Sequence, residues 1–134
     1  MISIITIVLN DKDNIKRTIQ SVLNQNIEIE YIIIDGGSTD GTLEVIEKYR
    51  DKIDILVSEK DDGIYNAMNK ATEKANGEWV CFMNSGDGFY NSNVLKNILP
   101  NIENSVDVVY GDWEVRYASK NKIKKANNSI DKIW

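Results

Sequence analysis

The sequence predicts an α/β fold, a three-layer α/β/α sandwich with a mainly parallel central sheet. Short apolar runs rich in β-branched residues alternate along the chain with segments whose apolar residues recur at helical spacing. The connections between these segments are short, and polar or glycine-rich residues follow the strands. Regular β-α-β alternation of this kind predicts parallel strands joined by helices that cover the sheet.

The first strand and the first helix have the clearest patterns. Residues 2–9 form a nearly continuous apolar and β-branched run, as expected of a strand that is buried on both faces. A helix is predicted from about Asn14, with Asp11 and Asp13 as candidate N-caps. Its apolar residues fall at i, i+4, i+7 and i+8 and therefore share one helical face: Ile15, Ile19, Val22 and Leu23.

The remaining elements continue the alternation. Strands are predicted at 31–34, 54–57, 79–83 and 107–110, and helices at 42–49, 64–75 and 94–99. Thr39 or Asp40 is the expected cap of the second helix, and Asn76-Gly77 supplies the stop of the third. The fourth helix is expected to end at Pro100, the only proline of the chain.

Residues 1–134 are expected to form one domain, because the length suits a single core and no linker or internal repeat divides it. Residues 119–134 are rich in lysine and asparagine and are predicted to form a basic, solvated and mobile tail. The alternative is a basic strip that faces phosphate or an anionic membrane surface. The chain reaches Trp134 without a clear closing element, which predicts a truncated domain.

Composition excludes several kinds of chemistry. The net charge of −5 argues against nonspecific binding of nucleic acid. The chain has no histidine and one cysteine, which excludes histidine-based catalysis, an internal disulfide and a multi-cysteine zinc site. Cys81 and Trp79 lie in an apolar strand and are interpreted as core residues. No apolar run approaches the roughly 20 residues of a membrane helix, and no basic segment precedes the first strand, so we expect a cytoplasmic protein.

Polar, acidic or glycine-rich residues follow four successive predicted strands, at 9–11, 35–41, 58–63 and 84–88. Each could be an ordinary turn, but in open parallel sheets ligands bind beyond the carboxyl ends of the strands. The first of these turns contains no glycine, so neither a dinucleotide-binding nor a P-loop motif is present there. Carboxylates at this edge instead suit Mg²⁺ or Mn²⁺ bridging to a diphosphate.

These segments carry a family resemblance. The chain resembles glycosyltransferase family 2, a family of inverting enzymes with the GT-A fold. Each matching segment alone is weakly specific, but the ordered set covers nearly all of residues 2–90. The segments are Ser3 to Asn10, Ser21 to Gln25, Ile33 to Thr42, Asp62 to Lys70 and Gly77 to Asp87.

The resemblance implies roles for particular residues. Asp35 would approach the nucleobase or ribose of a nucleoside-diphosphate sugar, most often a UDP-sugar, whereas Asp40 is interpreted as a helix cap. Residues 84–87 stand where the family places its metal-binding Asp-x-Asp-Asp motif, but Asn84 and Gly86 replace two of the acidic residues. The implied donor-binding residues are Leu9, Asn10, Asp35, Gly63, Asn66, Asn69, Asn84 and Ser85, with Asp87 as the ligand of Mg²⁺ or Mn²⁺.

The resemblance implies metal-assisted, inverting transfer of a sugar to the hydroxyl of a saccharide or lipid-linked saccharide, in bacterial surface polysaccharide or glycolipid synthesis. A peripheral contact with the inner face of the plasma membrane is left open. The family's catalytic base is expected beyond Trp134, because the spacing of Asp112, the nearest candidate, does not match. The alternative is a non-catalytic nucleotide-binding module, which the short chain and the substitutions at Asn84 and Gly86 favour.

Overall fold

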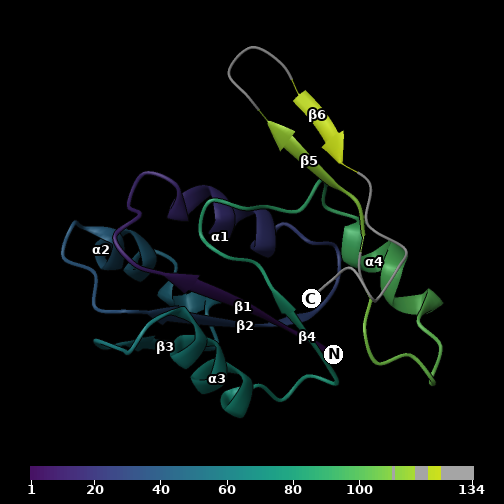
Figure 1. The fold of residues 1–134 in the computed structure, drawn as a ribbon, viewed down its shortest axis with the longest axis horizontal. Coiled ribbons are helices and arrows are strands. Elements are labelled where there is room, and N and C mark those ends of the chain that lie inside the picture. The colour runs from purple at the N-terminus through teal and green to yellow at the C-terminus, as the bar shows by residue number, and fades with distance from the viewer. Residues whose placement is uncertain (110, 117–120, 125–134) are drawn as a thin grey trace. The chain divides into compact units, whose positions relative to one another are not determined.

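The computed structural model describes residues 1–109, 111–116 and 121–124, and the chain divides into two compact units, Met1–Asn97 and Ile98–Trp134. The expected single domain over 1–134 stays a prediction. The first unit alternates strands and helices (Figure 1). Its elements are β1 (Ile2–Val8), α1 (Ile15–Leu23), β2 (Ile29–Asp35), α2 (Thr42–Glu47), a 3-10 turn (Arg50–Lys52), β3 (Ile55–Ser58), α3 (Ile64–Lys74), β4 (Trp79–Phe82) and nearly all of α4 (Val94–Ile98).

The four strands of the first unit form one sheet in the order β3-β2-β1-β4, and every pair is parallel. The long apolar strands β1 and β2 occupy the centre, where both faces of a strand are covered. All seven residues of β1 are buried, and so are six of the seven in β2. The predicted parallel α/β sheet is therefore confirmed, with the most continuously apolar runs in its middle.

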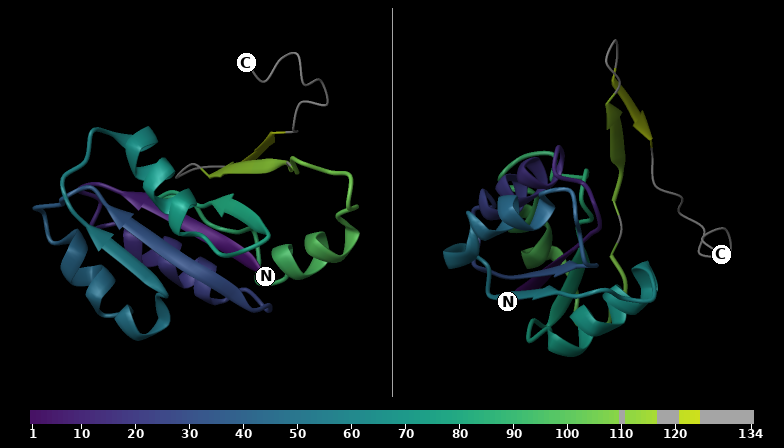
Figure 2. Two further views of the ribbon diagram at one scale, coloured as in Figure 1. Left: turned by 90° about the horizontal axis from the view of Figure 1, so that it is seen from below. Right: turned by 90° about the vertical axis from the view of Figure 1, so that its left-hand side faces the viewer.

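Helices cover both faces of this sheet, as Figure 2 shows for α3 on one side and for α1 and α2 on the other. Successive side chains of a strand point to opposite faces, so Ile5 and Ile32 pack beneath α3, where Ala67 and Ala71 are fully buried. The small alanine side chains let the α3 backbone approach the strands. The expected layering of helix, sheet and helix is thus present within the first unit.

A hydrogen-bonded chain on the opposite face links the core to the end of β4. The Thr6 hydroxyl donates to the Met83 carbonyl at 2.8 Å and lies 2.9 Å from the fully buried hydroxyl of Tyr31. Because the single hydroxyl proton of Thr6 is used, Tyr31 must be the donor to it. Burial raises the pKa of Tyr31, which keeps its phenol protonated for this bond. The chain fixes the point where the residues after β4 leave the sheet.

A carboxylate closes the amino-terminal edge of the sheet. Glu30 is 7% exposed and accepts hydrogen bonds from the Ser3 hydroxyl, the Asn76 backbone N–H (2.8 Å) and the Asn76 amide Nδ2 (2.7 Å). The Gly77 N–H in turn donates to Ser3 Oγ at 2.8 Å. Burial alone would raise the pKa of Glu30, but the bonds from Ser3 and Asn76 outweigh it and the pKa is lowered. This cluster ties the α3–β4 connection to β1 and β2.

The second unit contains a 3-10 turn (Leu99–Asn101) and the antiparallel pair β5 (Trp113–Arg116) and β6 (Asn121–Lys124). The predicted strand at 107–110 is wrong over residues 107–109, which form no strand; Tyr110 lies outside the described residues. Val108 is 71% exposed and pairs with no strand among the described residues, and an unpaired, exposed run does not form a stable strand. β6 lies within residues 119–134, where a basic, solvated tail is predicted; that tail stays a prediction, and its other residues lie outside the described part of the chain.

Two of the predicted helix caps need correction. α1 begins after Asn14 without a side-chain cap, and the Asp11 carboxylate accepts from the Asn14 side chain at 2.7 Å instead. α2 begins after Gly41, whose φ of 102° suits glycine. The Asp40 carboxylate nevertheless accepts the Thr42 N–H at 3.0 Å, from the position just before the N-cap residue Gly41. α4 ends at Ile98, just before the turn that contains Pro100.

Candidate functional site

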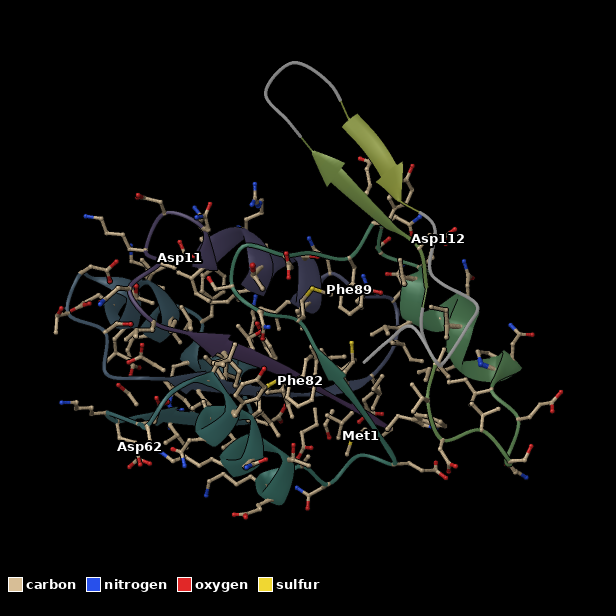
Figure 3. All side chains as sticks on the ribbon, in the orientation of Figure 1. Met1, Asp11, Asp62, Phe82, Phe89 and Asp112 are labelled. Carbon is tan, nitrogen blue, oxygen red and sulfur yellow. The ribbon has the colours of Figure 1, made fainter. Side chains whose placement is uncertain are left out.

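The carboxyl ends of the four parallel strands meet at one edge of the first unit, here called the carboxyl edge, which comprises residues 9–13, 36–41, 59–63 and 83–88. Figure 3 shows Asp11 and Asp62 at this end of the sheet, away from Met1 at the start of β1. The predicted convergence of the four polar turns is therefore present. The parallel strand directions bring them together, although the turns lie up to 79 positions apart along the chain.

The turns after β1 and β2 are hydrogen-bonded to each other. The Asn10 N–H donates to Ser38 Oγ and the Thr39 N–H donates to Asn10 Oδ1, both at 2.8 Å. Asn10 has a φ of 50°, a left-handed conformation that asparagine tolerates better than most residues. Leu9, 59% exposed, precedes it. The predicted donor-binding pair Leu9 and Asn10 is thus held at the surface of the carboxyl edge by the turn that follows β2.

Asp35 has a different place from the one expected of a ligand-binding carboxylate. It is fully buried at the end of β2. Its carboxylate accepts from the Ser38 N–H (3.2 and 3.3 Å), the Ser38 hydroxyl and the Ser58 hydroxyl (2.7 Å). These internal donors offset the cost of burying the charge. Asp35 therefore ties the turns after β2 and β3 together, and its contact with a nucleobase stays a prediction.

Asp61 is the carboxylate that lies against the turn after β2, and sequence reasoning missed it. Its Oδ1 accepts the Gly63 N–H at 3.0 Å. Its Oδ2 lies 3.3 Å from where a Cβ at Gly36 would be, so the absent side chain of Gly36 leaves room for it. Within the part of the chain that is described, Oδ2 has no hydrogen-bond partner. The Asp61-x-Gly63 spacing, typical of a side-chain turn before a helix, was the available signal.

The start of α3 contributes the predicted polar residues after β3. Gly63 precedes the helix with a φ of 111°, and no atom lies within 4 Å of where its Cβ would be. Asn66 is half-buried and Asn69 is exposed. Lys70 Nζ forms an ion pair with Glu59 Oε1 at 2.8 Å, and this lysine lowers the pKa of Glu59. The Lys70 ammonium group is therefore paired with a carboxylate of the protein itself.

The turn after β4 lies beside the turn after β1. The Ser85 hydroxyl donates to Asp11 Oδ2 at 2.7 Å, and the Ser85 N–H donates to the Ile7 carbonyl at 3.2 Å. Asn84 Oδ1 is buried and has no hydrogen-bond partner among the described residues. Asp87 is exposed, and no described residue hydrogen-bonds to its carboxylate. Unlike the buried Asp35, Asp87 therefore presents an open carboxylate.

The carboxyl edge partly fits a divalent cation. Asp87 supplies a charged oxygen, and Asn84 Oδ1 is an orphaned neutral acceptor in the same turn. No group of three or more acidic, histidine or cysteine residues that could hold a metal occurs within the described ranges. Mg²⁺ is commonly held by one or two carboxylates together with substrate phosphates and water. Asp87 and Asn84 fit that incomplete kind of site, in which the diphosphate would complete the coordination.

The predicted core residues of β4 are only partly covered. Cys81 and Trp79 are half-buried, and the alternate residues Val80 and Phe82 are 37% and 38% exposed. Burial raises the pKa of the Cys81 thiol, which suits an unreactive packing residue. No helix in the described part of the chain is long and apolar enough to cross a bilayer.

The fold and the carboxyl edge define a class: α/β proteins that bind a ligand beyond the carboxyl ends of a parallel sheet. Within that class the chain belongs to glycosyltransferase family 2, because the family model described as "Glycosyl transferase family 2" matches residues 3–133. The resemblance inferred from the sequence motifs is therefore confirmed.

Two curated relatives support the same assignment. A PGL/p-HBAD biosynthesis glycosyltransferase of Mycobacterium bovis is 31% identical over 122 residues, which are 87% of this chain and 48% of that protein. A Bacillus subtilis protein named as a candidate teichuronic acid biosynthesis glycosyltransferase, TuaG, is 35% identical over 102 residues, or 73% of this chain and 40% of that protein. The chain thus spans less than half the length of these relatives.

Solved structures agree on the fold. Residues 1–349 of Staphylococcus aureus TarS in complex with UDP-GlcNAc match with a TM-score of 0.68 and 26% identity, over 82% of this chain and 37% of that one. A mannosyltransferase of Pyrobaculum calidifontis in complex with GDP-Man and Mn²⁺ matches with a TM-score of 0.66 and 23% identity, over 72% and 30%. The predicted GT-A, Rossmann-like α/β fold is confirmed.

Proposed function

We propose that this chain is the donor-binding part of a glycosyltransferase that takes a UDP-sugar and glycosylates a saccharide or lipid-linked saccharide hydroxyl with inversion. The observation that carries the proposal is the carboxyl edge of a family 2 chain, where four turns are hydrogen-bonded into one surface. The UDP-GlcNAc complex of TarS supports the donor class, and the relatives' names support cell-surface glycans as products. A location at the inner face of the plasma membrane belongs to the same proposal.

The proposed recognition of the nucleoside uses the turns after β1, β2 and β3. Leu9 and Asn10 are exposed beside the turn that follows β2. Asp61 Oδ2 is an unpartnered carboxylate oxygen, suited to accept from a base N–H or a ribose hydroxyl. Asp35 would contribute indirectly, because its hydrogen bonds with Ser38 and Ser58 hold these turns in place. In this proposal Asp61 makes the contact that the sequence assigned to Asp35.

The proposed diphosphate end of the donor lies at the turn after β4 and the start of α3. Asp87 and Asn84 Oδ1 would hold Mg²⁺ or Mn²⁺, with Ser85 of the same turn and with Asn66 and Asn69 of α3 as further polar residues for the donor. When bound, such a cation neutralises the negative charge that develops on a leaving diphosphate. The catalytic base stays a prediction, expected beyond Trp134.

Calorimetry with UDP and UDP-GlcNAc, with and without Mn²⁺, tests the proposal. We expect Mn²⁺-dependent binding that Asp87→Ala weakens by about tenfold or more, because a charge-assisted contact contributes ~1.5–3 kcal/mol. Asp61→Asn should weaken binding both with and without Mn²⁺, since its contact is to the nucleoside. Asp51→Ala is the matched control, because Asp51 is exposed in the 3-10 turn that precedes β3 at the other edge.

Two results would redirect the proposal. No binding of UDP or UDP-GlcNAc under either condition would remove donor binding from this chain. Metal-independent binding that is insensitive to Asp87→Ala would instead support a non-catalytic nucleotide-binding module. The incomplete acidic set of residues 84–87 is the observation that favours this second function.

A further inference from the structure

The turn after β4 is held from outside by one buried hydroxyl on α1. Thr18 is fully buried, and its Oγ1 accepts the Gly86 N–H at 3.0 Å while donating to the Asp87 carbonyl at 2.7 Å. A threonine hydroxyl has one proton to donate and two lone pairs. Thr18 therefore fixes the peptide group that precedes Gly86 and the peptide group that follows Asp87.

Two neighbours on α1 bind the same turn. Arg17 Nη2 donates to the Gly86 carbonyl at 2.9 Å, and Ser21 Oγ accepts the Phe89 N–H at 2.6 Å. Positions 17, 18 and 21 lie on one side of a helix, since residues three and four apart are neighbours on its surface. By contrast, the turn itself has one backbone–backbone hydrogen bond among the described residues, in which the Asp87 N–H donates to the Asn84 carbonyl at 3.0 Å. The conformation of residues 86–89 thus depends on α1.

The bonding of Thr18 is unusual for a threonine in a helix. Such a hydroxyl commonly bonds back to the carbonyl four residues earlier, as Thr72 does to Met68 at 2.9 Å on α3. Among the described residues, the Thr18 hydroxyl makes no hydrogen bond within α1 and bonds only to the turn after β4. Gly86, with a φ of 96°, adopts a backbone conformation that a non-glycine side chain would disfavour. Glycine at 86 and threonine at 18 together define the path of this turn.

We propose that Thr18 is a positioning residue, which sets the Asp87 carboxylate for the cation and diphosphate of the donor. The inference rests on the proposed function of the carboxyl edge. Asp87 is the single carboxylate of its turn, so no second acidic residue there could compensate for a displaced one. Loosening the Gly86–Asp87 backbone should therefore weaken the cation-dependent part of donor binding and leave the nucleoside part intact.

The test compares Thr18→Val, which keeps the shape and removes the hydroxyl, with Thr18→Ser, which keeps the hydroxyl. Thr72→Val is the matched control, because it removes a threonine hydroxyl bond within α3. Binding of UDP with Mn²⁺ and of UMP in EDTA is measured by calorimetry or NMR titration. We expect Thr18→Val to weaken UDP–Mn²⁺ binding about tenfold, as for the loss of two hydrogen bonds. UMP binding should stay unchanged, and Thr18→Ser should restore most of the UDP–Mn²⁺ affinity.

The outcomes separate the inference from the function on which it rests. Wild-type UDP–Mn²⁺ binding that Thr18→Val leaves intact, or equal losses for UDP–Mn²⁺ and UMP, would overturn the positioning role alone. No wild-type binding would overturn both. If circular dichroism shows Thr18→Val to be unfolded, Ser21→Ala replaces it, because Ser21 is only half-buried and bonds the same turn at Phe89. The selective loss with Ser21→Ala supports the inference, and its absence refutes it.

Discussion

Glu30→Gln should destabilise the protein at neutral pH and much less in acid, because the cluster at the amino-terminal edge of the sheet depends on the charge of this carboxylate. Glu30 is 7% exposed and accepts hydrogen bonds from Ser3 Oγ and from two donors of Asn76. A glutamine keeps the shape and one acceptor oxygen but loses the charge. Reorientation of the Asn76 amide could satisfy the new NH₂ group, so the loss of charge assistance is the main cost.

The magnitude follows from the three bonds. A hydrogen bond to a charged group contributes ~1.5–3 kcal/mol and a neutral one ~0.5–1.5 kcal/mol, a difference of about 1 kcal/mol per bond. Three such differences give a loss of ~3 kcal/mol. Burying a neutral amide costs less desolvation than burying a carboxylate, which offsets part of this loss. We therefore expect the free energy of unfolding to fall by ~2 kcal/mol at pH 7.

The lowered pKa of Glu30 determines how its contribution to stability changes with pH. The hydrogen bonds hold the pKa of Glu30 below its ordinary value of 4.5 in the folded protein, despite the opposing effect of burial. The stabilisation by the ionised group is present above pH ~4.5 and is lost as the pH falls through the folded pKa. The difference between wild type and Glu30→Gln should therefore shrink in acid, where the protonated carboxyl resembles the amide.

Urea unfolding followed by circular dichroism at pH 7 and at pH 3 measures both quantities. Glu28→Gln is the control, because Glu28 is exposed just before β2 and should leave the free energy of unfolding within ~0.5 kcal/mol of wild type. A Glu30→Gln cost that is equal at the two pH values, or that is absent at pH 7, would refute the account of this cluster.

Further predictions concern the packing of the first unit, with unfolding in urea as the measurement. Gly77→Ala should destabilise by ~1–3 kcal/mol or more, because its Cβ would lie 2.5 Å from the Ser3 backbone nitrogen and hydroxyl; wild-type stability would contradict this. Ile32→Ala, which empties a fully buried position beneath α3, should cost ~2–5 kcal/mol. Tyr65→Ala, at a side chain that is 79% exposed, should change stability by less than ~0.5 kcal/mol.

Local pattern determined most of the first unit. The continuous apolar runs of β1 and β2 identified strands buried on both faces, and these strands occupy the centre of the sheet. The helical spacing of Ile15, Ile19 and Val22 identified the face of α1 that is buried. The ordered motifs indicated the family. Each of these signals lies within a short stretch of sequence, where burial imposes its period directly on the residue types.

The weakest predictions fell in the second unit. Val108 and Val109 have the composition of a strand but are 71% and 44% exposed, whereas the strand forms at Trp113–Arg116. A strand of four residues has too few positions for alternation to be distinguished from chance, and its existence depends on a partner. For β5 the partner is β6, which lies in a segment whose lysines and asparagines resemble a solvated loop.

The sequence by itself identified the turns of the carboxyl edge, and only the tertiary structure decided which of their carboxylates are open. Asp35 has the position of a ligand-binding residue, yet the hydroxyl of Ser58, 23 residues later, donates a hydrogen bond to its carboxylate within the protein. Asp61 instead reaches the space that Gly36 leaves free. Asp87 remains open, held by Thr18 from 69 residues away. The residue types of a turn follow from its local conformation, whereas the partners of a side chain depend on which strands are neighbours in the sheet.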